Sequence, residues 1–144
     1  MPSKDSEIIH ANCVSFDGKG LLILGASGAG KSSLTFEMIA LGATLVSDDR
    51  TCLRVVGQSL WAEAPEAIRG IIEARGVGIL ASPSLQGERI YAAVDLDRIE
   101  DQRLPPLREI VLVGQTIPCL RKVENPSFSA ILLHYLRYGM QSGV

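Results

Sequence analysis

The chain has 144 residues, of which 47% are apolar, and its formal net charge is −2. This length suits a single domain with a substantial hydrophobic core. The nearly balanced charge gives no sign of the basic surface that binds nucleic acids, so we expect no nucleic-acid partner.

The number of cysteines and the length of the apolar runs indicate the cellular compartment of the protein. Cys13, Cys52 and Cys119 are scattered and odd in number, which argues against a disulfide framework and favours a reducing compartment. The first ten residues lack the basic-then-apolar order of a signal peptide. No apolar run approaches the roughly 20 residues that cross a bilayer. We therefore expect one cytoplasmic domain over residues 1–144, without a membrane partner.

The first half of the chain predicts two β-hairpins around one helix. Residues 8–26 read as two strands that turn at Asp17-Gly18. A glycine-rich loop follows, and apolar residues at helical spacing then predict a helix over 31–42 that stops at Gly42. The remaining elements expected here are a short strand over 43–47 and a second hairpin over 50–65 that turns at Gly57-Gln58.

The second half predicts further strands and one clear helix. Residues 65–71 suggest one or two helical turns, and the apolar segment 71–81 is broken by Gly76 and Gly78. Asn125 and Pro126 are suited to the start of a helix over 125–140. Strands are expected over 89–96, 108–114 and 116–123, with a loop over 100–106. Many strands with two main helices indicate an α/β or α+β fold.

The most specific motif is GASGAGKS, which fits the phosphate-binding pattern G-x-x-x-x-G-K-[ST] between a predicted strand and a predicted helix. In such a P-loop the glycines turn backbone N–H groups toward phosphate oxygens, and the helix adds its positive dipole end. Lysine reaches the terminal phosphates and the serine hydroxyl ligates Mg²⁺. The predicted nucleotide-binding residues are Gly25, Ala26, Ser27, Gly28, Ala29, Gly30, Lys31 and Ser32.

Two adjacent aspartates, Asp48 and Asp49, end the strand that follows the P-loop helix. Strand ends lie near the phosphate loop in sheets of this type. Phosphoryl transfer to a hydroxyl needs a carboxylate near the metal and a base. The alternative is a simple turn, because aspartate is common in turns for structural reasons alone.

Three segments, GASGAGKSS, LVSDDR and IIEARGVGIL, in this order resemble the catalytic domain of HPr kinase/phosphorylase. The family's characteristic segment reads approximately E-I-R-G-L-G-I, and here it is Glu73 to Ile79. The resemblance runs from about His10 to the last helix. In its extent, the chain resembles the short, single-domain members of the family. It implies a strand-rich α/β P-loop domain of the HPr kinase/PEP carboxykinase-like type.

The resemblance implies an ATP- and Mg²⁺-dependent protein-serine kinase that phosphorylates HPr, the small phosphocarrier of the phosphotransferase system. Family members also remove this phosphate by phosphorolysis, and they commonly form homo-oligomeric hexamers. Matched to the family, Asp49 is the base that accepts the serine proton, while Lys31 and Ser32 are the P-loop pair. Glu73 matches the magnesium ligand, and Asp48 would face the metal.

Other residues match functional positions of the family less firmly. His10 matches a functional histidine of the family, although from the residues alone a structural strand histidine is favoured. Arg103 matches a functional arginine in a D-R-L-like context. Arg75 is equally compatible with binding phosphate and with a structural ion pair. His134, on the apolar face of the last helix, is interpreted as packing.

The chain departs from the family pattern at several places. Ser33 stands where an acidic residue is common, and ASPSLQGERIYAAV replaces a glycine-containing apolar loop. The segment PCLRKVENPSF keeps Arg121 and Lys122 but lacks the family's glycine. These differences leave the phosphorolysis reaction open. Two other readings remain: a small-molecule kinase, and a nucleotide-sensing regulator that acts without chemistry.

Overall fold

A computed structural model of the chain describes residues 5–141, and in this range strands far outnumber helices. The elements, in chain order, are β1 (Ser6–Phe16), β2 (Lys19–Leu24), α1 (Lys31–Ala40), β3 (Thr44–Ser47), β4 (Arg50–Val56), β5 (Ser59–Glu63), the 3₁₀ helix η1 (Glu66–Ile68), β6 (Ile71–Ala74), β7 (Gly78–Ala81), β8 (Glu88–Ile99), β9 (Glu109–Leu112), β10 (Gln115–Lys122) and α2 (Phe128–Tyr138).

The described strands form one large mixed sheet and one separate hairpin. The large sheet has eight strands, in the order β2-β1-β4-β5-β8-β10-β9 with β3 paired to β1. β2 lies between β1, which runs antiparallel to it, and β8, which runs parallel. Because β5 also pairs with β8, the circuit β1-β4-β5-β8-β2 closes on itself. The fold is therefore α/β, with a strand-rich mixed sheet.

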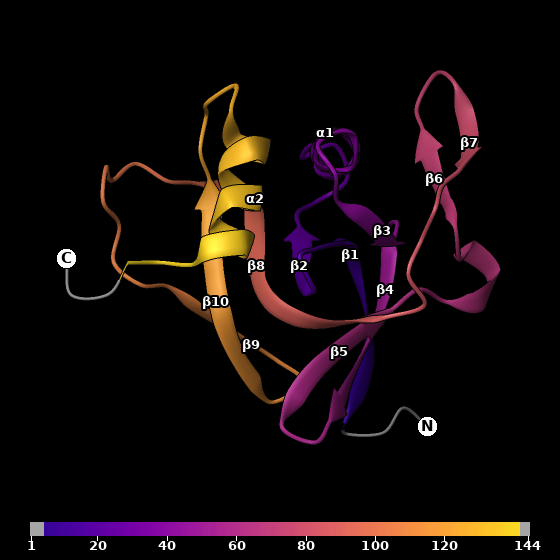
Figure 1. Cartoon of the computed structure of the whole chain (residues 1–144), viewed down its shortest axis with the longest axis horizontal. Coiled ribbons are helices and arrows are strands. Elements are labelled where there is room, and N and C mark those ends of the chain that lie inside the picture. The colour runs from indigo at the N-terminus through magenta and orange to yellow at the C-terminus, as the bar shows by residue number, and fades with distance from the viewer. Residues whose placement is uncertain (1–4, 142–144) are drawn as a thin grey trace.

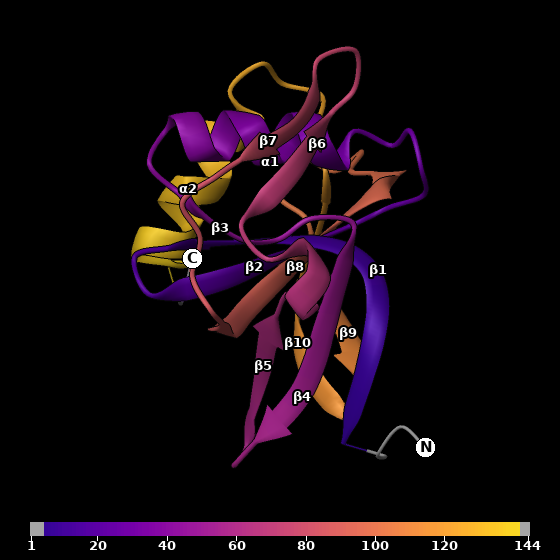
Figure 2. The same cartoon turned by 90° about the vertical axis from the view of Figure 1, so that its right-hand side faces the viewer.

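The long strands β1 and β8 each serve two partners, because they bend (Figures 1 and 2). The first part of β1 pairs with β4, and its second part pairs with β2 and β3. The start of β8 pairs with β5, and its later residues pair with β2 and β10. The bends turn β4 and β5 away from the helices, which lie on the other side of the molecule (Figure 2).

Alternate residues of β2 enter two different cores. Leu21 and Ile23 belong to the cluster beneath α1 and α2, whereas Leu22 belongs to a second cluster on the opposite face. Successive side chains of a strand point to opposite faces, so a strand buried on both sides reads as the continuous apolar run that precedes the glycine-rich loop. The two helices lie side by side over the first core (Figure 1).

Most predicted elements are confirmed. Both hairpins form, and Asp17 and Gly18 at the first turn have φ values of 54° and 74°. The glycine-broken segment is an antiparallel hairpin, β6–β7, that stands on the same side of the sheet as the helices (Figures 1 and 2).

The predicted start of the last helix at Pro126 is wrong. α2 begins at Phe128 with Ser127 as its N-cap residue, and it ends at Tyr138. Asn125 acts one turn earlier, because its side-chain oxygen accepts the Ser127 N–H at 2.8 Å and its carbonyl accepts the Phe128 N–H at 2.9 Å. None of the helices within residues 5–141 is both long and apolar enough to span a membrane.

Candidate active site

The glycine-rich loop joins β2 to α1 and leaves the start of the helix open. Gly28 and Gly30 have φ values of 85° and 105°, a conformation in which a side chain is strained. Within the described chain no side chain caps α1, and its first turn contains no acidic residue. The first N–H groups of a helix lack partners inside the helix and carry a partial positive charge. The loop therefore offers an anion site at this helix end.

Lys31, the first residue of α1, folds back onto the loop. Its side chain is buried, and Nζ donates to the carbonyls of Gly25 at 2.7 Å and Ala26 at 3.1 Å. An ammonium group has three donors. Two are used within the loop, so the third can serve a phosphate oxygen without loss of the other two.

The two aspartates occupy a tight turn between β3 and β4. The Arg50 N–H donates to the Asp48 carbonyl at 2.8 Å, and Asp49 between them has a φ of 70°. This bond and this φ are those of a positive-φ γ-turn, which is rare and strained. The turn is fixed by the Ala11 N–H, which donates to the Asp49 carbonyl, and by Ser47 Oγ, which donates to the Arg50 carbonyl. Strain of this kind clusters at functional sites.

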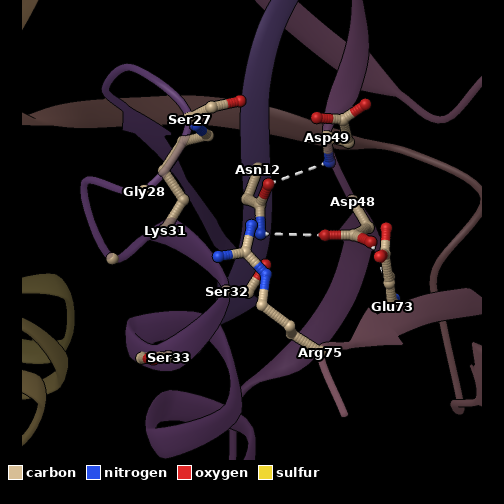
Figure 3. Close-up of a pocket in the computed structure, with 11 residues that line it drawn as sticks. Asn12, Ser27, Gly28, Lys31, Ser32, Ser33, Asp48, Asp49, Glu73 and Arg75 are labelled. Carbon is tan, nitrogen blue, oxygen red and sulfur yellow. Dashed lines mark hydrogen bonds between the residues drawn. The ribbon is translucent and has the colours of Figure 1, made fainter. Parts of the chain in front are cut away.

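Asn12 on β1, which sequence analysis missed, holds both aspartates and the helix together. Its Nδ2 donates to Thr35 Oγ1 at 2.9 Å and to Asp48 Oδ1 at 3.1 Å. Its Oδ1 accepts the backbone N–H of Asp49 at 2.8 Å (Figure 3). The side chain is 1% exposed. The available signal was an amide in the middle of an apolar strand, since a buried amide needs several partners.

Asp48 is a buried carboxylate with donors on both oxygens. Oδ1 accepts from Asn12, and Oδ2 accepts the backbone N–H of Glu73 at 2.9 Å. Burial raises the pKa of Asp48 above its ordinary value, and repulsion from Asp49 and Glu73 adds to this, while the two hydrogen bonds act in the opposite direction. Asp48 therefore links β3 to the β6–β7 hairpin, which carries Glu73.

Asp49 is exposed and pairs with His10. His10 Nε2 lies 2.7 Å from Asp49 Oδ1, and because a carboxylate accepts and does not donate, the imidazole is the donor. On the other oxygen, Oδ2, Arg50 Nε lies at 4.0 Å, beyond hydrogen-bond distance. The pair thus holds one carboxylate oxygen and leaves the other accessible to a hydroxyl.

A cleft of about 310 Å³ brings most of the predicted residues together (Figure 3). The glycine-rich loop forms one wall, and the aspartates with the β6–β7 hairpin form the other. Arg75 extends from the hairpin into the space between them (Figure 3). The lining residues are Asn12, Ser27, Gly28, Gly30, Lys31, Ser32, Ser33, Asp48, Asp49, Glu73 and Arg75.

Five predicted residues are absent from this lining: Gly25, Ala26 and Ala29 of the glycine-rich loop, and His10 and Arg103. His10 is not part of the cleft lining and reaches the site through Asp49. Arg103 is exposed on the loop that connects β8 to β9 and is also absent from the lining. The base of this loop is fixed by Arg108, whose guanidinium donates to both oxygens of Glu100 at 3.0 Å.

The cleft fits a magnesium ion that enters with a phosphate ligand. Magnesium is commonly bound by one or two carboxylates together with phosphate oxygens and water. Asp48, Glu73 and the Ser32 hydroxyl all border the cleft. Each Asp48 oxygen accepts one hydrogen bond and keeps further acceptor capacity. Within residues 5–141 no group of three or more His, Cys, Asp or Glu side chains is arranged to hold a metal.

A second hollow of about 260 Å³ opens on the other side of the aspartates. It shares Asp48, Asp49 and Glu73 with the first cleft. Its remaining lining is Arg50, Ile68, Ile71 and Ile79. The carboxylates therefore separate a polar cleft beside the glycine-rich loop from a hollow with apolar walls.

Comparison with known proteins fits this arrangement. Residues 3–99 match the family model of the HPr Serine kinase C-terminal domain. The chain belongs to this family. The matched segment contains the glycine-rich loop, both aspartates and the β6–β7 hairpin, and it ends with β8.

Curated relatives extend well beyond the matched part. The chain is 46% identical over 80 residues to the HPr kinase/phosphorylase of Caldanaerobacter subterraneus subsp. tengcongensis, and the match covers 55% of this chain and 26% of that protein. It is 34% identical over 126 residues to the HPr kinase/phosphorylase of Streptococcus salivarius, and this match covers 78% of this chain and 41% of the relative. The chain thus spans less than half the length of these relatives.

A solved structure confirms the fold. The structure of the Hpr(Ser) kinase/phosphatase from Coxiella burnetii superposes with a TM-score of 0.79 and 23% identity. The match covers 91% of this chain and 88% of the Coxiella chain. The sheet and helices described above are therefore the architecture of that protein.

Proposed function

We propose that this chain is an ATP- and Mg²⁺-dependent protein-serine kinase whose acceptor is an HPr-type phosphocarrier of the phosphotransferase system. The observation that carries the proposal is the position of Asp49, which is held by His10 and lines the same cleft as Lys31 at the open helix end. Membership in the family supports the choice of acceptor. A cytoplasmic location and a homo-oligomeric state belong to the same proposal.

Each wall of the cleft has its own task in the transfer. The loop N–H groups, the helix end and Lys31 hold the phosphates of the nucleotide and neutralise charge that builds up on them. Asp48, Glu73 and Ser32 hold the magnesium ion, which supplies charge stabilisation for the transferring phosphoryl group. Arg75 projects into the cleft and adds a second cation at the phosphates (Figure 3).

Asp49 orients the acceptor serine and accepts its proton late in the transfer. His10 donates to Oδ1, so the carboxylate is held in one orientation, with Oδ2 available for the serine hydroxyl. The acceptor approaches from the second hollow, which borders Asp49 away from the glycine-rich loop. This approach would bring the serine hydroxyl to Asp49 from the side away from the glycine-rich loop, so that the hydroxyl can lie opposite the leaving oxygen across the γ-phosphorus, as in-line transfer requires.

The test is transfer of labelled phosphate from ATP·Mg²⁺ to purified HPr-type carriers, with wild type beside Asp49→Asn. We expect label on a carrier serine in the wild type and a loss of at least about a hundredfold in rate for Asp49→Asn, the range of general-base contributions. ATP binding should remain nearly unchanged. Equal loss of binding and transfer in the variant would mean that Asp49 is structural or metal-bound.

Other outcomes separate the alternatives. ATP turnover without label on any carrier would indicate a small-molecule acceptor. Tight nucleotide binding with no turnover would indicate a nucleotide-sensing regulator. Release of pyrophosphate from phosphorylated carrier and inorganic phosphate would add the reverse reaction to the kinase.

A further inference from the structure

One peptide group of the glycine-rich loop is held at both ends by opposite charges. The carbonyl of Gly25 and the N–H of Ala26 belong to the same peptide unit. Lys31 Nζ donates to this carbonyl at 2.7 Å. On the other side, the N–H donates to the Asp97 carboxylate, with Oδ1 at 3.1 Å and Oδ2 at 3.0 Å. The peptide dipole therefore lies between an ammonium group and a carboxylate, in the direction that both stabilise.

Asp97 reaches the loop from β8, the strand that runs parallel to β2. β2 and β8 pair up to Leu24 and Asp95, so the residues that follow both strands stay close together. Gly25 has a φ of 155°, and a Cβ there would lie 3.0 Å from Ala29 Cβ and 3.3 Å from Leu96 Cβ. The absence of a side chain at Gly25 thus allows the loop to lie directly against β8.

The backbone of Asp97 is itself fixed. Its N–H donates to Asp95 Oδ1 at 2.9 Å, and Arg98 Nε lies 3.6 Å from Asp95 Oδ2. The carboxylate of Asp97 is therefore presented to the loop by a local network on β8. Because Asp97 does not line the cleft, it acts on a bound phosphate only through the loop.

We propose that Asp97 is a positioning residue that fixes the Gly25–Ala26 peptide so that the loop stays formed and Lys31 stays aimed for phosphate binding. Without the carboxylate, this peptide can rotate and withdraw the Gly25 carbonyl from Nζ. The buried Lys31 ammonium then loses its shortest contact, and the glycine-rich loop has to re-form when a nucleotide binds. This role rests on the proposed nucleotide-dependent function, which the same loop serves.

The test combines Asp97→Asn, which keeps an acceptor and removes the charge, with Asp97→Leu, which removes both. Asp17→Asn is the matched control, because Asp17 is an exposed carboxylate in the turn at the opposite end of β2, and asparagine tolerates its positive φ. Three quantities are measured for each protein: the amide proton shift of Ala26 by NMR without nucleotide, the Kd for ATP·Mg²⁺, and kcat at saturating ATP.

We expect the Ala26 amide proton of the free protein to move upfield in Asp97→Leu, because its carboxylate partner is lost. The Kd should rise about tenfold in this variant, the scale of one charge-assisted hydrogen bond, and less in Asp97→Asn. At saturating ATP, kcat should stay within about twofold of wild type, since bound nucleotide rebuilds the loop. Asp17→Asn should change none of these quantities.

An unchanged Ala26 shift and an unchanged Kd in both variants would overturn the proposal. So would a Kd effect in Asp97→Leu that merely follows a fall in the thermal unfolding midpoint, with Asp97→Asn identical to wild type. If wild-type protein binds no ATP, the proposed function fails separately. The difference in Ala26 amide proton shift between nucleotide-free wild type and Asp97→Leu then decides alone whether the contact exists. If this difference is absent, the inference is overturned.

Discussion

Asn12→Ala tests whether one buried amide holds the Asp48–Asp49 turn in place against α1. The substitution removes the donor to Thr35 and Asp48 and the acceptor for the Asp49 N–H. A net hydrogen bond between uncharged groups is worth about 1 kcal/mol and one to an ionised group about 2 kcal/mol, so the three bonds together amount to about 4 kcal/mol. This is a large part of the 5–15 kcal/mol that typically stabilises a domain.

The assay is urea unfolding of the wild type and of two variants at neutral pH. With a slope of about 2 kcal/mol per molar, the expected loss lowers the unfolding midpoint by about 2 M in Asn12→Ala. Thr51→Val is the matched control, because Thr51 is also fully buried but donates only one hydrogen bond, to the Ala11 carbonyl at 2.9 Å. Its expected cost is about 1 kcal/mol.

Activity separates positioning from stability. In Asn12→Ala the Asp49 N–H loses its acceptor, so the strained turn relaxes and phosphate transfer falls even where the variant is fully folded. Thr51→Val should transfer phosphate at the wild-type rate. A destabilisation of Asn12→Ala no greater than that of Thr51→Val, together with normal transfer, would refute the assignment of Asn12 as the support of the turn.

Two further predictions concern parts of the fold outside the cleft. A Cβ on Gly87 would lie 2.6 Å from Nε1 of Trp61, the chain's only tryptophan, so Gly87→Ala should cost about 1–3 kcal/mol through overpacking and shift the tryptophan emission to longer wavelength. In a Trp61→Leu background the same substitution should cost little, and an equal cost there would contradict the steric explanation. The hydrogen bonds from Arg108 lower the pKa of Glu100 below its ordinary value of 4.5. The pair therefore adds stability above pH 4.5 that is lost as the pH falls through the lowered pKa of the folded state. The difference in unfolding midpoint between wild type and Glu100→Gln should be present at pH 7 and shrink toward pH 3, and a difference independent of pH would show that the charge of Glu100 is not responsible.

The local parts of the fold were predictable because short-range chemistry determines them. Asp17-Gly18 and Gly57-Gln58 can each form a tight turn, and the apolar residues on both sides can only pair. The glycine-rich loop was equally readable, since its pattern specifies a strand before it and a helix after it. The start of α2 was misplaced because Asn125 has the side chain of a helix cap, yet here it caps a turn that precedes the helix.

The supports of the site were not predictable, because each joins segments far apart in the sequence. Asn12 contacts Thr35, Asp48 and Asp49 across 23 to 37 positions, and Asp97 contacts Ala26 across 71 positions. A sequence pattern shows which residue types are present but not which ones the sheet brings together. Arg103 illustrates the converse, since its local context suggested a catalytic residue and the structure places it outside the cleft lining.

The position of β2 explains why these two supports come from where they do. Its neighbours are β1 on one side and β8 on the other. β1 carries Asn12, which fixes the aspartates, and β8 carries Asp97, which fixes the glycine-rich loop. A loop that leaves the end of a strand has no ladder hydrogen bonds of its own, so polar side chains from the two flanking strands have to satisfy it and the elements around it. The proposed phosphate-binding loop and the proposed base are thus supported separately, one by each neighbour of the same strand.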